Sequence, residues 1–256
     1  MKNKKLLIAG LFLLLVFLFS AGKLLSIYSG YRKSAESYDA LREIAAGETA
    51  SASAPAAAAS TASAPTAAPD PTVWRQVDFD ALRALNRDVV AWIYVEGTPI
   101  DYPVVQADDN EYYLDRHFTD DGSTGGCIFL DCDNSPQFSD PHSVLYGHNM
   151  LDGSMFAELM YYKTQDFYDA HPTGQLLTPE RNYHVDFFAG CIVDTAEGTW
   201  DTTLKADEIS DWFAGQTERS CFASTVELRP GDRVITLSTC SYEFNDARFV
   251  LSGILY

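Results

Sequence analysis

A cysteine and an arginine near the end of the chain are spaced in a way that suits chemistry on a carbonyl group. Cys240 ends the run Val-Ile-Thr-Leu-Ser-Thr-Cys, which begins at Val234 after a Pro-Gly-Asp turn signal. The run is short and contains several β-formers, so it predicts a strand rather than a helix. Arg248 lies eight residues further on and precedes a second strand-like run. We therefore expect a thiol and a guanidinium on neighbouring strand ends, facing one reacting carbonyl.

A histidine can complete this set. His148 follows a strand-like run and Gly147, which places it on a loop at a strand end. A thiol attacks only as the thiolate, and an imidazole nearby can take up or return the proton. Arg248 would supply a permanent positive charge for a developing oxyanion. Nucleophile, acid/base and oxyanion stabiliser are the minimum set for acyl transfer.

These residues also have ordinary structural interpretations. Most cysteines are structural, and Arg248 could simply pair with Asp246 on a loop, where an exposed ion pair contributes ~0–1 kcal/mol. Cys240 alone would be weak support for catalysis. The combination with His148 in similar strand-end surroundings favours the catalytic interpretation.

The other cysteines and histidines predict less. The chain has five cysteines, an odd number that leaves at least one thiol unpaired. One bridge, between Cys127 and Cys132, is compatible with the sequence, and Cys191 is expected to be buried in a strand. Cys221 could compete with Cys240 in oxidation. A zinc site would have to combine the following residues, whose spacing fits none of the usual patterns: Cys127, Cys132, His142 and His148.

The formal net charge is −18, which argues against nucleic acid as a partner because phosphate binding requires a basic face. The chain contains no phosphate-binding loop, no G-x-S-x-G nucleophile motif and no H-E-x-x-H motif. Its length is sufficient for one good core with appendages.

The N-terminal region predicts export. Residues 6–22 form an uncharged apolar run just long enough to cross a membrane, and residues 1–5 hold three lysines that favour a cytoplasmic N-terminus. A cleaved signal peptide is the alternative, because Ser20, Ala21 and Gly22 are small. We favour an uncleaved anchor, since the run exceeds the usual signal-peptide core. In either case the bulk of the chain lies outside the membrane.

The rest of the chain divides into three parts. Residues 23–49 have helical character and predict a juxtamembrane helix or stalk. Residues 50–72 are mostly Ala, Ser, Thr and Pro and predict an extended linker. Residues 73–256 predict the folded domain.

Within that domain, short runs alternate with turn signals, which indicates a mostly β barrel or sandwich. Strands are expected at residues 89–95, 100–105, 126–130, 143–147, 175–178, 183–195, 233–238 and 249–255. Helical segments are expected at 77–86 with Asp78 as cap, at 110–114 as a short turn, at 154–161 with Ser154 as cap, and at 207–217.

Several ordered motifs resemble those of sortases. The segment Thr-Leu-Ser-Thr-Cys ending at Cys240 resembles their Thr-Leu-x-Thr-Cys signature, and Arg248 falls at the position of their essential arginine. The region around His148, with Gly-Ser-Met-Phe at 153–156, looks like the histidine region of class B sortases. Segments 102–106 and 109–114 add to the resemblance, which covers residues 73–256.

This resemblance implies a closed eight-stranded β-barrel with N-terminal helices and a helix before the cysteine-bearing strand. It implies a Gram-positive, membrane-anchored extracellular transpeptidase that needs no metal or organic cofactor. Cys240 would attack the carbonyl after Thr in an Asn-Pro-x-Thr-x type sorting signal and form a thioester. His148 would protonate the leaving amine, and Arg248 would hold the oxyanion. The acceptor would be an amine of the cell wall or of a pilin, and Ser238, Asn110 and Leu114 would occupy substrate-groove positions.

Two other functions remain open at this stage. A thiol protease would perform the same first half-reaction and release the acyl group to water. A non-catalytic surface adhesion module would retain its function without the thiol of Cys240.

Overall fold

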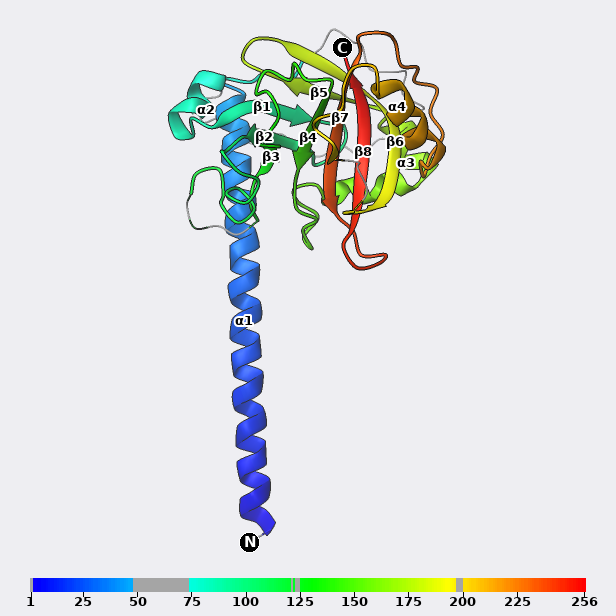
Figure 1. Cartoon of the computed structure of the whole chain (residues 1–256). Coiled ribbons are helices and arrows are strands. Elements are labelled where there is room, and N and C mark those ends of the chain that lie inside the picture. Colours follow the sequence, from blue (N-terminus) through cyan, green and yellow to red (C-terminus); the bar gives the residue numbers. More distant parts are fainter. Residues whose placement is uncertain (1, 48–73, 121, 123–124, 197–199) are drawn as a thin grey trace, which may run out of the picture.

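The computed structural model describes residues 2–47, 74–120, 122, 125–196 and 200–256, and Figure 1 shows a barrel at one end of a long helix. Helix α1 (Lys2–Ala45) contains a window with a mean hydropathy of 2.2 whose residues have no protein contact that buries them. It is long and apolar enough to cross a membrane, as the sequence predicts. The expected linker at 50–72 lies outside the described residues.

The last turns of α1 pack against the barrel. Tyr38, Leu41 and Ala45 are buried and belong to the main hydrophobic cluster. The Tyr38 hydroxyl donates to the carbonyl of Gly126 at 2.8 Å, and its ring lies 4.4 Å from the ring of His117. The C-terminal part of the segment expected to be a stalk is therefore part of the barrel's core.

Eight strands close into a barrel in the order β1-β2-β3-β4-β7-β8-β6-β5. This confirms the mostly β, eight-stranded closed barrel. The strands are β1 (Val89–Tyr94), β2 (Asp101–Val105), β3 (Ile128–Leu130), β4 (His142–Tyr146), β5 (Thr173–Leu177), β6 (Asn182–Asp194), β7 (Arg233–Cys240) and β8 (Ala247–Leu255). Most neighbours are antiparallel, but β4 pairs in parallel with β7, and β2 with β3.

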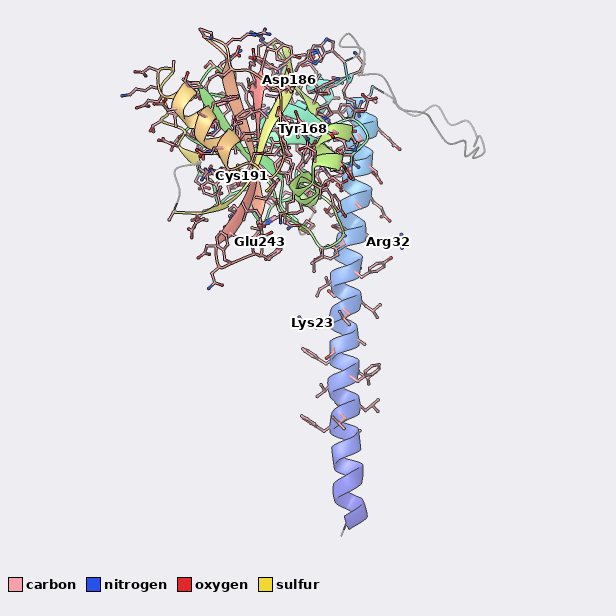
Figure 2. All side chains as sticks on the ribbon, turned by 90° about the vertical axis from the view of Figure 1, so that its right-hand side faces the viewer. Lys23, Arg32, Tyr168, Asp186, Cys191 and Glu243 are labelled. Atoms are coloured by element: carbon pink, nitrogen blue, oxygen red, sulfur yellow. The ribbon has the colours of Figure 1, made fainter. Side chains whose placement is uncertain are left out.

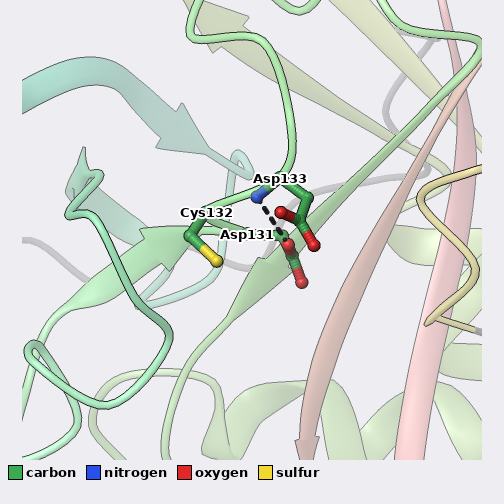
Figure 3. A group of neighbouring side chains, drawn as sticks. All are labelled: Asp131, Cys132 and Asp133. Carbon is green, nitrogen blue, oxygen red and sulfur yellow. Dashed lines mark hydrogen bonds between the residues drawn. The ribbon is translucent and has the colours of Figure 1, made fainter.

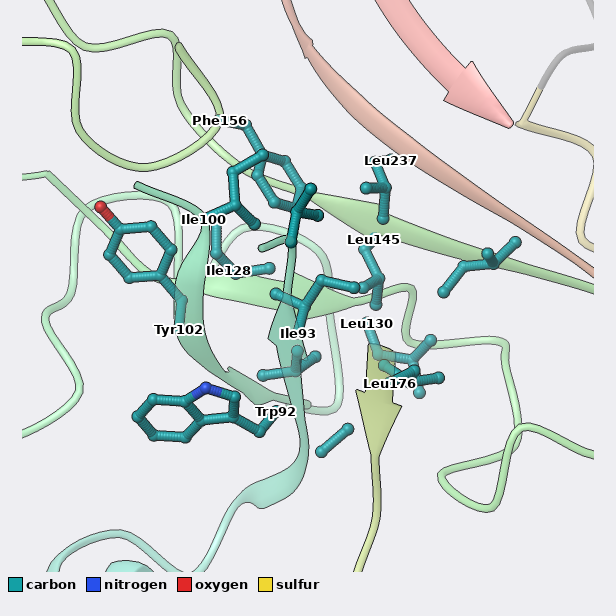
Figure 4. Packing of buried hydrophobic residues seen from close by; sticks show 14 of the residues in the cluster. Trp92, Ile93, Ile100, Tyr102, Ile128, Leu130, Leu145, Phe156, Leu176 and Leu237 are labelled. Atoms are coloured by element: carbon teal, nitrogen blue, oxygen red, sulfur yellow. The ribbon is translucent and has the colours of Figure 1, made fainter. Parts of the chain in front are cut away.

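Large aliphatic and aromatic side chains fill the barrel, and Figure 4 shows part of this packing around Ile93, Ile128 and Leu145. A second cluster lies between the outer face of the sheet and helix α4 (Ile209–Glu218), and includes Phe188, Cys191 and Val250. Both faces of the central part of β6 are therefore buried, which explains its continuous apolar run.

The shorter helices differ in part from the sequence expectation. Helix α2 (Phe79–Leu85) begins after Asp78, whose side chain accepts from the Ala81 amide, so this cap is confirmed. The expected helix at 154–161 is wrong: a 3₁₀ helix, η1 (Ala157–Lys163), follows instead. Ser154 bonds to Asp152 rather than capping a helix. Residues 110–114 form only turns, and α3 (Gln165–Ala170) was not expected.

Candidate active site

Three strand ends meet at one end of the barrel. In the antiparallel pair of β7 and β8, Cys240 lies opposite Arg248. In the parallel pair of β4 and β7, Tyr146 lies opposite Ser238, and the Gly147 amide donates to the Ser238 carbonyl at 3.1 Å. Because both strands run in the same direction, the residues that follow Tyr146 lie beside the end of β7. The register thus brings the loop after β4 beside the hairpin of β7 and β8, which is far from it in sequence.

His148 lies on the loop that leaves β4, and its backbone carbonyl accepts from the Phe156 amide at 3.0 Å. The neighbouring Asn149 donates from Nδ2 to the Cys240 carbonyl at 2.9 Å, which ties the loop to the end of β7. His148 Nε2 lies 2.7 Å from the Leu114 carbonyl oxygen. A carbonyl only accepts, so Nε2 carries a hydrogen and Nδ1 is the ring nitrogen left for proton transfer.

Arg248 is half-buried and is not used in an ion pair with another described residue. Its Nη1 donates to the carbonyl of Ala247 at 3.0 Å. The alternative pairing with Asp246 is not formed. The guanidinium lines the same cavity as Cys240, where its charge can act on an anionic group.

These residues surround a cavity of about 400 Å³. The six residues singled out from the sequence all line it: Asn110, Leu114, His148, Ser238, Cys240 and Arg248. The sequence did not single out the other six: Phe129, Tyr146, Gly147, Thr195, Trp200 and Thr239. Trp200 donates from its indole nitrogen to Ser238 Oγ at 2.9 Å, a contact that no sequence pattern indicates.

A buried carboxylate organises one wall of the cavity. Asp131 accepts at Oδ2 from Asn110 Nδ2 at 3.0 Å and from the Tyr146 hydroxyl at 2.7 Å. Asn110 Oδ1 in turn accepts from the Cys132 amide at 2.9 Å. Burial, and then the hydrogen bond to Asp131, raise the pKa of Tyr146, so its hydroxyl remains a donor. The orientation of the Asn110 amide is fixed by a carboxylate on one side and an amide hydrogen on the other.

Among the described residues, one group of side chains has the spacing of a metal site: Asp131, Cys132 and Asp133, shown in Figure 3. Asp131 already accepts from side chains and from the Asp133 amide, so its oxygens are engaged. The four residues considered for zinc do not come together. His142 lies between Thr236 and Asp201, and Cys127 Sγ donates to the Arg116 carbonyl.

The five cysteines all lie among the described residues, and none of them forms a disulfide. The bridge between Cys127 and Cys132 is therefore wrong: the buried Cys127 bonds to a backbone carbonyl, and burial raises its pKa to about 12. Cys191 is buried, as expected, and Cys221 is exposed. Cys240 is half-buried and is the cysteine that opens into the cavity.

The sequence and the fold of this chain are similar to those of several known proteins. No family model matches the sequence. Sortase B of Listeria monocytogenes is 38% identical over 177 residues, which cover 68% of this chain and 72% of the relative. The structure of the Staphylococcus aureus sortase B–substrate complex matches with a TM-score of 0.65 and 29% identity, over 70% of this chain and 84% of that one. A Streptococcus pyogenes class B sortase involved in pilus biogenesis matches with a TM-score of 0.65 and 28% identity, over 70% of this chain and 98% of that one.

Proposed function

The chain belongs to the class B sortase family, cysteine transpeptidases of the cell surface that act on sorting signals, and we propose that Cys240, His148 and Arg248 perform its reaction. The observation that supports these roles most directly is the strand register. It pairs Cys240 with Arg248 across the hairpin, and His148, on the loop after β4, lines the same cavity.

In the first half-reaction, the Cys240 thiolate attacks the carbonyl carbon after Thr in an Asn-Pro-x-Thr-x type signal. Arg248 stabilises the negative charge that develops on the carbonyl oxygen. His148 Nδ1 takes the thiol proton and delivers it to the leaving amine as the carbon–nitrogen bond breaks. The hydrogen bond from Nε2 to the Leu114 carbonyl fixes the ring orientation and leaves Nδ1 as the nitrogen that exchanges the proton.

In the second half-reaction, an amine attacks the thioester and His148 accepts its proton. A new amide forms and the Cys240 sulfur leaves. We propose a cell-wall or pilin amine as acceptor; a pilin is consistent with the pilus role of the Streptococcus pyogenes relative. Asn110, Leu114 and Ser238 contact the signal in the groove, since they line the same cavity.

The membrane supplies the second partner. We propose that α1 crosses the membrane once, with its lysine-rich start in the cytoplasm and the barrel outside. Proteolysis of intact cells tests this orientation, because a tag before Lys2 should be protected while the barrel is cleaved. Cleavage of that tag from outside would reject the orientation.

A fluorogenic sorting peptide tests the catalytic assignment. Cys240→Ala, His148→Ala and Arg248→Ala should each lower turnover by at least ~100-fold, the scale expected for loss of a general acid/base or an oxyanion stabiliser. Arg248→Lys, which keeps the charge but loses the planar fork, should also fall sharply with an unchanged melting temperature. The matched control is Cys221→Ala, since that thiol is exposed and does not line the cavity.

An added amine separates transfer from hydrolysis. With the amine present, mass spectrometry should detect the amide product formed from the thioester. The amount of hydrolysed peptide should fall correspondingly. If no amine changes the product, the second half-reaction proposed here is wrong. Full activity in all three alanine variants would reject the assignment of the catalytic residues.

A further inference from the structure

The anchor helix leaves the barrel at the end that carries the active-site loops. Ser34 on α1 and Met150 on the loop after β4 both adjoin Gly125, where a Cβ would lie 3.5 Å from Ser34 Oγ and 3.4 Å from Met150 Cε. Figure 1 shows the loop after β4 and the loop between β7 and β8 both pointing along α1 toward its N-terminus. A membrane around the N-terminal half of α1 would therefore face the tips of these two loops.

The tips of these loops expose large apolar side chains. Leu151 is 89% exposed on the loop after β4, and Tyr242 is 74% exposed on the loop after β7. Phe244 on the second loop is 45% exposed. Rings with one polar end and one apolar body favour the boundary between lipid headgroups and acyl chains, and aliphatic side chains favour the acyl side of it.

The height of these loops along α1 agrees with a position at the boundary between lipid headgroups and acyl chains. Beyond Lys23, α1 is uncharged and mostly apolar through Tyr28, and four of these residues are more than half exposed: Leu24, Leu25, Ile27 and Tyr28. Figure 2 places Glu243, at the tip of the β7–β8 loop, at about the height of Arg32. Arg32 is four residues above Tyr28, a rise of about 6 Å at 1.5 Å per residue. The headgroup layer is itself about 5–7 Å thick on each side of the hydrocarbon core.

We propose that the loops at residues 149–153 and 241–246 rest on the membrane surface, with Leu151, Tyr242 and Phe244 in contact with the headgroup layer. The proposal rests on the proposed membrane anchor, because α1 sets the height of the loops. The contact is apolar rather than electrostatic, since Asp152, Glu243 and Asp246 on the same loops would be repelled by anionic lipids. His148 and Cys240 immediately precede these loops, so the active site opens close to the bilayer.

Tethering by α1 removes most of the cost of bringing the loops to the lipid, because the contact becomes intramolecular. A contact by three side chains is therefore sufficient. The loop at 241–246 is held in position from the protein side: Lys163 on η1 donates to Glu243, and Ser241 donates to the same carboxylate. Tyr242 and Phe244 flank Glu243 in the chain, and both side chains remain exposed.

Depth-dependent quenching of introduced tryptophans tests the contact. The full-length chain is placed in phosphatidylcholine nanodiscs that carry bromine near the headgroup end of the acyl chain. Phe244→Trp reports on the loop, and Leu85→Trp on α2 is the matched control, because Leu85 is 49% exposed and Figure 1 shows α2 near the C-terminal end of α1. The wild-type chain, with four tryptophans, supplies the background. Ile27→Trp reports on the anchor itself.

We expect the added fluorescence of Phe244→Trp and of Ile27→Trp to be quenched at least about twofold more than that of Leu85→Trp, as for side chains at the interface. Quenching of Ile27→Trp with none of Phe244→Trp would reject the loop contact and leave the anchor intact. Quenching of neither would reject the anchor, and the loop contact with it. Equal quenching of Phe244→Trp and Leu85→Trp would show nonspecific adsorption and also overturn the proposal.

Discussion

The buried histidine of β4 gives a quantitative prediction about pH and stability. His142 has no exposed surface and lies beneath the ring of Trp212, 4.7 Å away. Its Nδ1 lies 3.1 Å from the Asp201 carbonyl, so Nδ1 donates, and its Nε2 accepts from the Thr236 hydroxyl at 2.9 Å. Both nitrogens are satisfied in the neutral ring. Burial is the main cause that lowers the pKa of His142 from 6.5 to about 4.

The direction in which pH changes the free energy of unfolding follows from proton uptake by His142. Below pH 6.5 the unfolded chain binds a proton at His142 that the folded chain does not bind until pH about 4. The free energy of unfolding therefore falls as pH falls, with the full contribution present above pH 6.5. The pKa difference of about 2.5 units corresponds to ~3 kcal/mol at 1.36 kcal/mol per unit, of which ~2 kcal/mol is lost by pH 5.

Urea unfolding of the full-length chain in a mild detergent measures this effect. Wild type and His142→Gln are compared between pH 4.5 and 7.5. We expect the variant to be less stable at pH 7.5, and the gap to narrow by ~2 kcal/mol at pH 5, because glutamine does not titrate. Glu158 and Asp186, whose pKa values are raised by burial, are present in both chains, so their titration cancels in the difference. A gap that stays constant with pH would refute the assignment of a neutral, buried His142.

Three further substitutions probe the site and its supports. Gly147→Ala should lower the free energy of unfolding by ~1–3 kcal/mol in the same urea assay, because a Cβ would lie 2.4–2.8 Å from two packed side chains; Gly215→Ala, with open space around it, is the control. Asp131→Asn should raise KM more than it lowers kcat with the sorting peptide, since it loses the acceptor that orients the cavity wall, whereas Asp133→Asn, which is exposed, should leave both unchanged. Trp200→Phe should raise KM about fivefold, the scale of one lost hydrogen bond of ~1 kcal/mol, with kcat retained; an unaltered KM in Asp131→Asn or in Trp200→Phe would contradict these roles.

The parts of the site that follow from sequence are those built by local pairing. Cys240 and Arg248 are separated by a short loop between two strands, so their spacing alone predicts that they face each other, as the hairpin register shows. His148 reaches the same place through the parallel pairing of β4 with β7, across more than 80 residues of chain. No local pattern reports such pairing, and the motif resemblance indicated it instead.

The features that the sequence predicted wrongly or did not predict have physical causes of the same kind. The helix expected at 154–161 depended on Ser154 as a cap, but Asp152 competes for its hydroxyl, and Met155 adopts a positive φ of 59° that ends any helical turn there. Trp200 and Asp131 act through side chains that meet only after the barrel closes. The packing of Tyr38 was missed because helical periodicity shows an apolar face without showing what covers it.

The three proposed catalytic residues differ in how firmly the fold holds them. Cys240 and Arg248 lie in an antiparallel ladder of eight paired positions, so their backbones move only with the barrel. His148 depends instead on loop hydrogen bonds: from its ring to the Leu114 carbonyl, from Asn149 to the Cys240 carbonyl, and from the Phe156 amide to its own carbonyl. The segment around Leu114 is itself held by the Cys127 amide on the Tyr113 carbonyl, next to the Gly126 carbonyl that accepts from Tyr38 of α1. In the proposed reaction we therefore expect proton transfer by His148 to be the step most sensitive to the packing of α1 against the barrel, while the backbones of Cys240 and Arg248 are fixed by the sheet.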